Sequence, residues 1–160
     1  MPDRLIIRAE RPDQPDVLPL LADLDAYLSS LYPPEANHIL DVQGLLASEV
    51  SFFVARDGSQ AVGTAAFRRK PGVSDAQGQA YGEIKRMYVD PAFRGRDIGV
   101  KLLDKIEAQL RGEGYKLALL ETGSRQTQAV RLYERCGYAR RGAFGGYPDN
   151  GLSVFYGKVL

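Results

Sequence analysis

Residues 86 to 103 read RMYVDPAFRGRDIGVKLL, which predicts the end of a strand, a short turn and the start of a helix. The β-type run from Ile84 to Val89 stops at Asp90-Pro91, and residues 94 to 99, RGRDIG, open an amphipathic helix. The first amides of a helix have no partner within it, and the helix dipole adds partial positive charge there. With two arginines beside it, this turn predicts a site for a phosphate or pyrophosphate.

Two common phosphate-binding loops are excluded, because no Gly-Lys-Ser/Thr follows the turn and no complete GxGxxG is present. The turn resembles motif A of the GNAT superfamily of N-acetyltransferases, in which R/Q-x-x-G-x-G/A holds the pyrophosphate of coenzyme A. Arg94 and Gly99 match its first and last positions, while Asp97 stands where the middle glycine is usual. A carboxylate there should repel a pyrophosphate, so we expect binding to survive with somewhat lower affinity.

A second resemblance lies in residues 126 to 138, QTQAVRLYERCGY. They are similar to motif B of the same superfamily, N-x-x-A-x-x-L-Y-x-x-x-G-F, with Gln126 at the Asn position and Tyr138 at the Phe position. Two motifs in the right order are far more specific than either alone. The clear match covers roughly residues 82 to 138, and the hairpin predicted upstream supports it.

The rest of the chain alternates helical and β-type patterns. Strands are expected at 5–9, 51–56, 60–68, 82–89, 117–121 and 152–159, with one more β-type run after Tyr138, and helices at about 13 or 16 to 30, 39–47, from 98 to about 112, and 126–136. Asp13 or Asp16 is expected to cap the first helix, Asp57-Gly58 to turn a hairpin, and residues 70 to 80 to form a surface loop. This order predicts an α/β chain with a mixed sheet, and the resemblance implies a GNAT-like acyl-CoA N-acyltransferase fold with helices on both faces of the sheet.

Composition limits the remaining possibilities. A chain of 160 residues with 44% hydrophobic residues suits a single domain spanning residues 1–160. The formal charge of +1 gives no argument for nucleic acid or an anionic membrane as a partner, and one Cys with one His gives no disulfide and no metal site. The charged N-terminus has no signal-peptide core, so a cytoplasmic protein is expected.

The resemblance implies two catalytic side chains. Tyr133 would be the general acid that protonates the departing coenzyme A thiolate, and Glu83, at the start of the motif strand, would accept the proton of the attacking amine directly or through water. Spacing alone leaves other readings open, because Tyr133 also fits a tyrosine packed in the core and Glu83 an ordinary strand glutamate.

The resemblance also implies binding residues for acetyl-CoA. The backbone of Met87 to Val89 would bind the pantetheine arm, and a backbone amide near Tyr88 would be the oxyanion donor. The turn at residues 94 to 99 and the second motif would bind the remainder of acetyl-CoA. The expected residues are Met87, Tyr88, Val89, Arg94, Gly95, Arg96, Asp97, Ile98, Gly99, Gln126 and Ala129. Acceptor-binding residues are expected at Tyr32, Glu35, His38 and Tyr147.

The function implied is an acetyl-CoA-dependent N-acetyltransferase that acetylates a primary amine of a small molecule or protein by direct attack in a ternary complex, as a possible homodimer. Because Asp97 and Gln126 depart from the family pattern, a non-catalytic acyl-CoA sensor stays open as the alternative. An unrelated nucleotide-phosphate binder is a third reading. Free thiol released with an amine panel separates the enzyme from the sensor.

Overall fold

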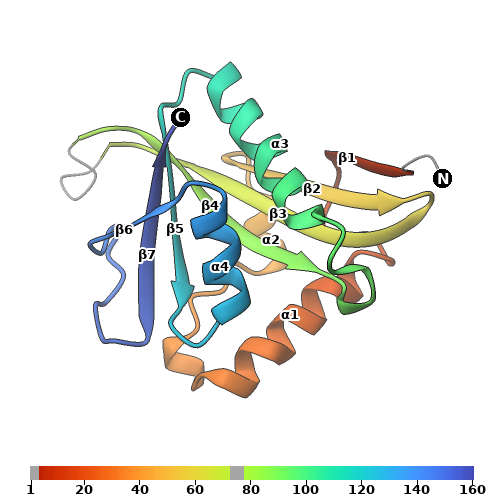
Figure 1. Cartoon of the computed structure of the whole chain (residues 1–160), viewed down its shortest axis with the longest axis horizontal. Helices are drawn as coiled ribbons and strands as arrows, with labels where there is room; N and C mark the ends of the chain where they lie inside the picture. The colour runs from red at the N-terminus through yellow and green to blue at the C-terminus, as the bar shows by residue number, and fades with distance from the viewer. Residues whose placement is uncertain (1–3, 73–77) are drawn as a thin grey trace. The chain divides into compact units, whose positions relative to one another are not determined.

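The computed structural model describes residues 4–72 and 78–160 and contains a seven-stranded sheet in the order β1-β2-β3-β4-β5-β7-β6 (Figure 1). The strands are β1 (Leu5–Ala9), β2 (Val50–Asp57), β3 (Gln60–Lys70), β4 (Tyr81–Val89), β5 (Leu117–Gly123), β6 (Ala139–Arg141) and β7 (Ser153–Val159). The helices are α1 (Leu18–Leu31), α2 (Val42–Leu45), α3 (Ile98–Gly112) and α4 (Thr127–Arg135), with short 3-10 turns at Pro34–Ala36 and Pro91–Phe93.

Strand directions confirm the mixed sheet that the sequence predicts. β1 and β2 pair antiparallel, β4 and β5 pair parallel with Gly82 opposite Ala118, and β7 is antiparallel to both β5 and β6. The predicted hairpin is confirmed as β2 and β3, which are neighbours joined by a two-residue turn. Gly58 in that turn has a φ of +63°, a conformation that glycine adopts without steric cost.

The chain forms two compact units. The first comprises Met1–Phe67 and Lys85–Ile106, and the second comprises Arg68–Ile84 and Glu107–Leu160. The single domain expected from chain length stays a prediction. The loop expected at residues 70 to 80 lies between β3 and β4, and its residues 73–77 are outside the described residues.

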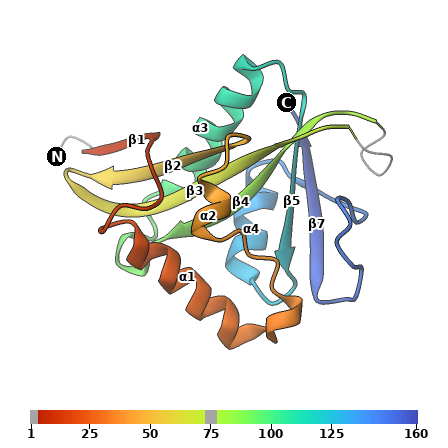
Figure 2. The same cartoon turned by 180° about the vertical axis from the view of Figure 1, so that it is seen from behind.

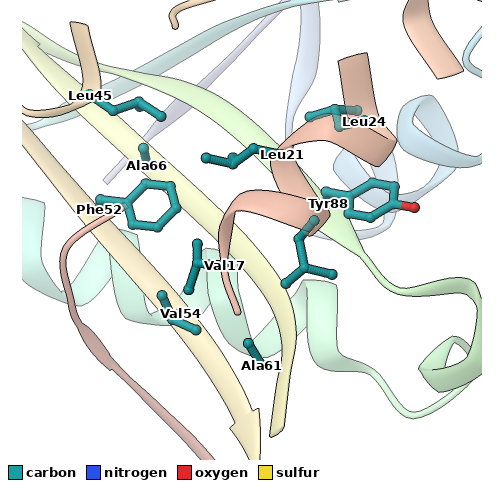
Figure 3. Packing of buried hydrophobic residues seen from close by; sticks show 10 residues of the cluster. Val17, Leu21, Leu24, Leu45, Phe52, Val54, Ala61, Ala66 and Tyr88 are labelled. Atoms are coloured by element: carbon teal, nitrogen blue, oxygen red, sulfur yellow. The ribbon is translucent and has the colours of Figure 1, made fainter. Parts of the chain in front are cut away.

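In the first unit, α1 lies on one face of β2 and β3, and the first half of α3 lies on the other, as Figures 1 and 2 agree. The apolar face of α1 packs on the strands (Figure 3) because leucines recur at helical spacing. The buried cluster contains Val17, Leu20, Leu21, Leu24, Leu45, Phe52, Val54, Ala61, Ala66 and Tyr88. On the other face, a Cβ added to Gly63 would lie 3.4 Å from Ile98 and Leu102 side-chain atoms of α3.

The predicted cap of α1 is wrong. The helix begins at Leu18, its cap residue is Val17, and no side chain caps it. Asp16 instead pairs with Arg56 at 2.6 Å, and Asp13 pairs with Arg11 at 2.7 Å, because both carboxylates have an arginine within reach. The second helix is also shorter than predicted, since Asp41 accepts from the Gly44 amide at 2.8 Å and starts it three residues late.

In the second unit, an aromatic cluster packs between the strands and the segment that precedes β7. Phe144 is its centre, with edge-on contacts to Tyr81, Tyr147 and Phe155 at ring-centroid distances of 5.7, 5.6 and 5.8 Å. Leu119 of β5 completes the buried set. This cluster fixes the position of the segment around Tyr147.

A buried polar network lies elsewhere in the second unit, around Glu107 of α3. The Glu107 side chain is 3% exposed and accepts from the Tyr138 hydroxyl at 2.9 Å and from Lys158 Nζ at 2.8 Å. Lys158 Nζ also donates to the Cys136 carbonyl at 2.8 Å. The end of α4, β7 and the second half of α3 are joined through these bonds.

Candidate functional site

The turn between β4 and α3 has the backbone expected of an anion site. Gly95 has a φ of +83° and Asp97 a φ of +58°, so two left-handed residues stand within the exposed segment from Arg94 to Asp97. A Cβ added to Gly95 would meet no atom within 4 Å, so a side chain would have space at this position. Glycine is favoured here because of the left-handed backbone and not because neighbouring atoms are close. Ile98 and Gly99 are buried and begin α3, whose first amides lack partners within the helix.

Both arginines of the turn bind neighbouring groups of the first unit. Arg94 Nε donates to the Val89 carbonyl at 3.1 Å, and its guanidinium lies 5.7 Å from the centre of the Tyr88 ring. Arg96 lies 5.5 Å from the centre of the Phe93 ring and 3.3 Å from an Asp57 carboxylate oxygen. They therefore hold the turn against β4 and β2 while adding positive charge beside it.

The left-handed backbone at Asp97 explains why a glycine is usual at this position of the motif. Asp is among the few non-glycine residues that occupy this region at modest cost. The departure from the pattern therefore keeps the shape of the turn and changes its charge.

Replacing Asp97 with Gly or with Asn should preserve the turn and tighten acetyl-CoA binding about fivefold, the effect of removing roughly 1 kcal/mol of repulsion between charges about 4 Å apart in water. Calorimetric titration of the free protein measures this affinity. Asp97→Ala serves as the control, because it removes the charge but strains the left-handed backbone. A large loss of affinity in the Gly and Asn variants would show instead that the Asp97 carboxylate supports the turn.

A left-handed residue also interrupts β4 itself. Arg86 has a φ of +58° although it lies within a strand, and its carbonyl accepts from the buried Thr64 hydroxyl at 2.8 Å. Its guanidinium pairs with the Asp25 carboxylate of α1, with Nη2 to Oδ2 at 3.4 Å. The regular strand geometry is therefore interrupted at Arg86, immediately before the segment expected to bind the pantetheine arm, and Arg86 ties β4 to α1.

The second unit brings Glu83 and Tyr147 together. Glu83 is 1% exposed, and its Oε1 accepts from Arg68 Nη2 at 3.0 Å. The Tyr147 hydroxyl donates to Glu83 Oε2. Burial first, and the Glu83 charge second, raise the pKa of Tyr147 far above its usual range, so this phenol stays protonated.

Tyr133 lies on α4 and is 6% exposed. Its ring meets the Tyr138 ring edge-on at a centroid distance of 5.9 Å. Burial first, and the Glu121 carboxylate second, raise the pKa of Tyr133 well above its usual range. A phenol that keeps its proton can serve as a hydrogen-bond donor or acid, and the acid role expected for Tyr133 stays a prediction.

The remaining predicted residues occupy defined local positions. Gln126 stands before α4, where its Oε1 accepts from the Gly123 amide at 2.8 Å and from the Thr122 hydroxyl at 3.3 Å. Ala129, on α4, is partly buried. Gln126 therefore fixes the turn from β5 into α4, a role that its amide oxygen fills as an asparagine oxygen would.

The residues expected to bind the acceptor belong to the segment after α1, except for Tyr147. Tyr32 is buried and ends α1, Glu35 is exposed in the 3-10 turn Pro34–Ala36, and His38 is partly buried. The His38 carbonyl accepts from Lys85 Nζ at 3.1 Å, which joins this segment to β4.

Within residues 4–72 and 78–160, no three His, Cys, Asp or Glu side chains are gathered so that they could hold a metal ion. None of the helices in the described parts of the chain is long and apolar enough to span a membrane.

Comparison with known proteins agrees with these features. The sequence pattern of the Acetyltransferase (GNAT) family matches residues 17–138. Over 160 residues the chain is 44% identical to the IAA acetyltransferase of Azospirillum brasilense, with 100% of each protein covered.

Two solved structures illustrate the shared fold. A candidate acyl-CoA N-acyltransferase from Klebsiella pneumoniae has 33% identity and a TM-score of 0.78, with 99% of each chain covered. A GNAT acetyltransferase from Elizabethkingia anophelis, solved with acetyl-CoA bound, has 18% identity and a TM-score of 0.65 over 99% of this chain and 100% of that one. Since the family pattern covers most of the sequence and the Azospirillum relative aligns with all of it, this chain belongs to the GNAT family of acetyltransferases.

Proposed function

We propose that this enzyme transfers the acetyl group of acetyl-CoA to a primary amine by direct attack in a ternary complex. The observation that carries the proposal is the turn from Arg94 to Gly99, where two left-handed residues precede the first turn of a helix. Such a turn suits a pyrophosphate, because backbone donors and the helix dipole act on the same anion. The family membership and the acetyl-CoA bound by the Elizabethkingia relative support this choice of cosubstrate.

In this proposal the first unit binds the cosubstrate. The amides of Gly95 to Gly99 hold the pyrophosphate, and the backbone of Met87 to Val89 binds the pantetheine arm. The left-handed Arg86 suits that second task, because it interrupts the regular strand just before those amides. Gln126 and Ala129 are the remaining residues proposed for the cosubstrate.

The second unit supplies the proposed chemistry. As the amine nitrogen bonds to the acetyl carbon and the carbon–sulfur bond breaks, the amine gives up a proton and the sulfur gains electrons. Glu83 is the proposed final acceptor of the amine proton, and Tyr133 donates its phenolic proton to the sulfur. Burial raises the pKa of both phenols, Tyr133 and Tyr147, so both keep their protons at ordinary pH and Tyr133 has a hydrogen to donate toward the sulfur.

The acceptor is proposed to be a primary amine on a small molecule or a protein. The proposed contacts to the acceptor are Tyr32, Glu35, His38 and Tyr147. The name of the Azospirillum relative refers to IAA. Loops that bind acceptors vary on a common scaffold, so we assign the class of acceptor and not a compound.

A thiol-release assay with acetyl-CoA and a panel of primary amines tests the proposal. We expect at least one amine to increase free thiol well above the amine-free rate and to yield an N-acetyl product by mass spectrometry. Matched alcohols are the control, since a hydroxyl is a far weaker nucleophile. Tight binding of acetyl-CoA without amine-dependent thiol release would favour the sensor over the enzyme.

A further inference from the structure

An acceptor amine cannot reach Glu83 directly. The residue is 1% exposed, and each carboxylate oxygen already accepts a hydrogen bond from a side chain of the second unit. Arg68 Nη2 donates to Oε1 at 3.0 Å, and the Tyr147 hydroxyl donates to Oε2. Because the Glu83 side chain is almost completely buried and each oxygen already has a side-chain partner, an amine of the acceptor has no direct approach to it.

Tyr147 is the more exposed residue of this pair. Tyr147 is only partly buried, and its ring is held edge-on by Phe144 at 5.6 Å and tilted against Phe155 at 6.4 Å. Its amide also donates to the Phe144 carbonyl at 3.2 Å. A phenol that donates its hydrogen still carries lone pairs on its oxygen, so the same hydroxyl can accept a proton while it donates to Glu83.

Tyr147 cannot act as a preformed base. Burial and the Glu83 charge keep the pKa of the phenol far above its usual range, so phenolate is absent at ordinary pH. The hydroxyl oxygen can take a proton only while its own proton moves to a second acceptor. Glu83 Oε2 is hydrogen-bonded in the position that this transfer requires.

We propose that Tyr147 is a catalytic proton relay, in which its hydroxyl oxygen accepts the proton of the acetylated amine while its own proton passes to Glu83. This inference rests on the proposed function. The phenol begins and ends neutral, and the carboxylate gains one proton, which returns through the same hydroxyl to water after the product leaves. Arg68 balances the charge of the buried carboxylate between turnovers, when it would otherwise be uncompensated.

A double-mutant cycle tests the relay. We expect Tyr147→Phe and Glu83→Gln each to lower kcat by about 10- to 100-fold, with little change in the KM for acetyl-CoA, because the cosubstrate site is untouched. Residues that act as one unit are not additive, so the double variant should be no slower than the slower single variant. Thermal unfolding of all three confirms that they are folded.

Tyr156→Phe is the matched control, since it also removes a tyrosine hydroxyl that donates to a glutamate of the second unit, Glu134 at 3.0 Å. Its kcat should equal that of the unchanged enzyme. Full kcat in Tyr147→Phe, or losses that multiply in the double variant, would overturn the relay even if Glu83→Gln is slow. Failure of the proposed function looks different, because the unchanged enzyme would then release no thiol with any amine.

Discussion

Tyr133→Phe is expected to lower kcat by about 100-fold or more while leaving the affinity for acetyl-CoA nearly unchanged. The ring keeps its edge-on contact with Tyr138, so only the hydroxyl is lost. General acids of this kind contribute about 10²- to 10⁴-fold. Steady-state kinetics on the best amine, together with calorimetric binding of acetyl-CoA, measure the two quantities separately.

The pH dependence sharpens this prediction. Because burial raises the pKa of Tyr133, the phenol stays protonated throughout an ordinary assay range and its ionisation should leave no step in the rate profile. Tyr156→Phe is again a suitable control, because its hydroxyl contacts Glu134 of the same helix α4. Unchanged kcat in Tyr133→Phe would remove Tyr133 from the acid role.

Asp25→Ala is expected to lower the free energy of unfolding by about 3 kcal/mol, much more than Arg86→Met. The Arg86 side chain is 4% exposed and that of Asp25 is 44% exposed, so the two changes leave different groups behind. Without Asp25 a buried guanidinium loses its carboxylate, which is costly. Without Arg86 the carboxylate is half-exposed and water solvates it, so we expect a loss of about 1 kcal/mol.

Urea unfolding of the two variants gives this comparison directly. Asp23→Ala is the control on α1, since Asp23 is exposed and surface changes usually stay within about 0.5 kcal/mol. Equal losses in the two test variants would mean that the pair is solvated like a surface ion pair. The difference between the two losses in free energy of unfolding therefore reports how strongly the buried Arg86 guanidinium on β4 depends on the Asp25 carboxylate of α1.

The sequence predicts most of the element order because apolar spacing and turn residues are local signals. It misses where α1 begins, since Asp16 is drawn away by Arg56, which lies 40 residues later. A carboxylate at a helix start can bind the helix amides or a cationic side chain that the fold brings near, and Asp16 binds the cation. Such competition leaves no trace in the residues around the helix start.

Within the candidate site, the sequence motifs identify the expected residues, but they do not indicate the tertiary contacts that hold these residues in place. Glu83 and Tyr147 are both predicted, yet nothing in the sequence indicates that they form a hydrogen bond across 64 positions. Arg86 looks like an ordinary strand residue in the sequence, and its left-handed backbone is accompanied by tertiary contacts with Thr64 and Asp25 that no local pattern indicates. Position 97 differs from these cases, because the family pattern already indicates that glycine is usual there. The left-handed backbone of Asp97 explains that preference.

The buried bond between Tyr138 and Glu107 implies that these two positions evolve together. Tyr138 stands where motif B usually has phenylalanine, and its added hydroxyl requires an acceptor inside the protein. A relative with phenylalanine at position 138 loses the hydroxyl that donates to one oxygen of the buried carboxylate at position 107, so an apolar residue should be tolerated at position 107. Alignments of close relatives should therefore show tyrosine at 138 accompanied by glutamate at 107, and lysine at 158 following the same pair.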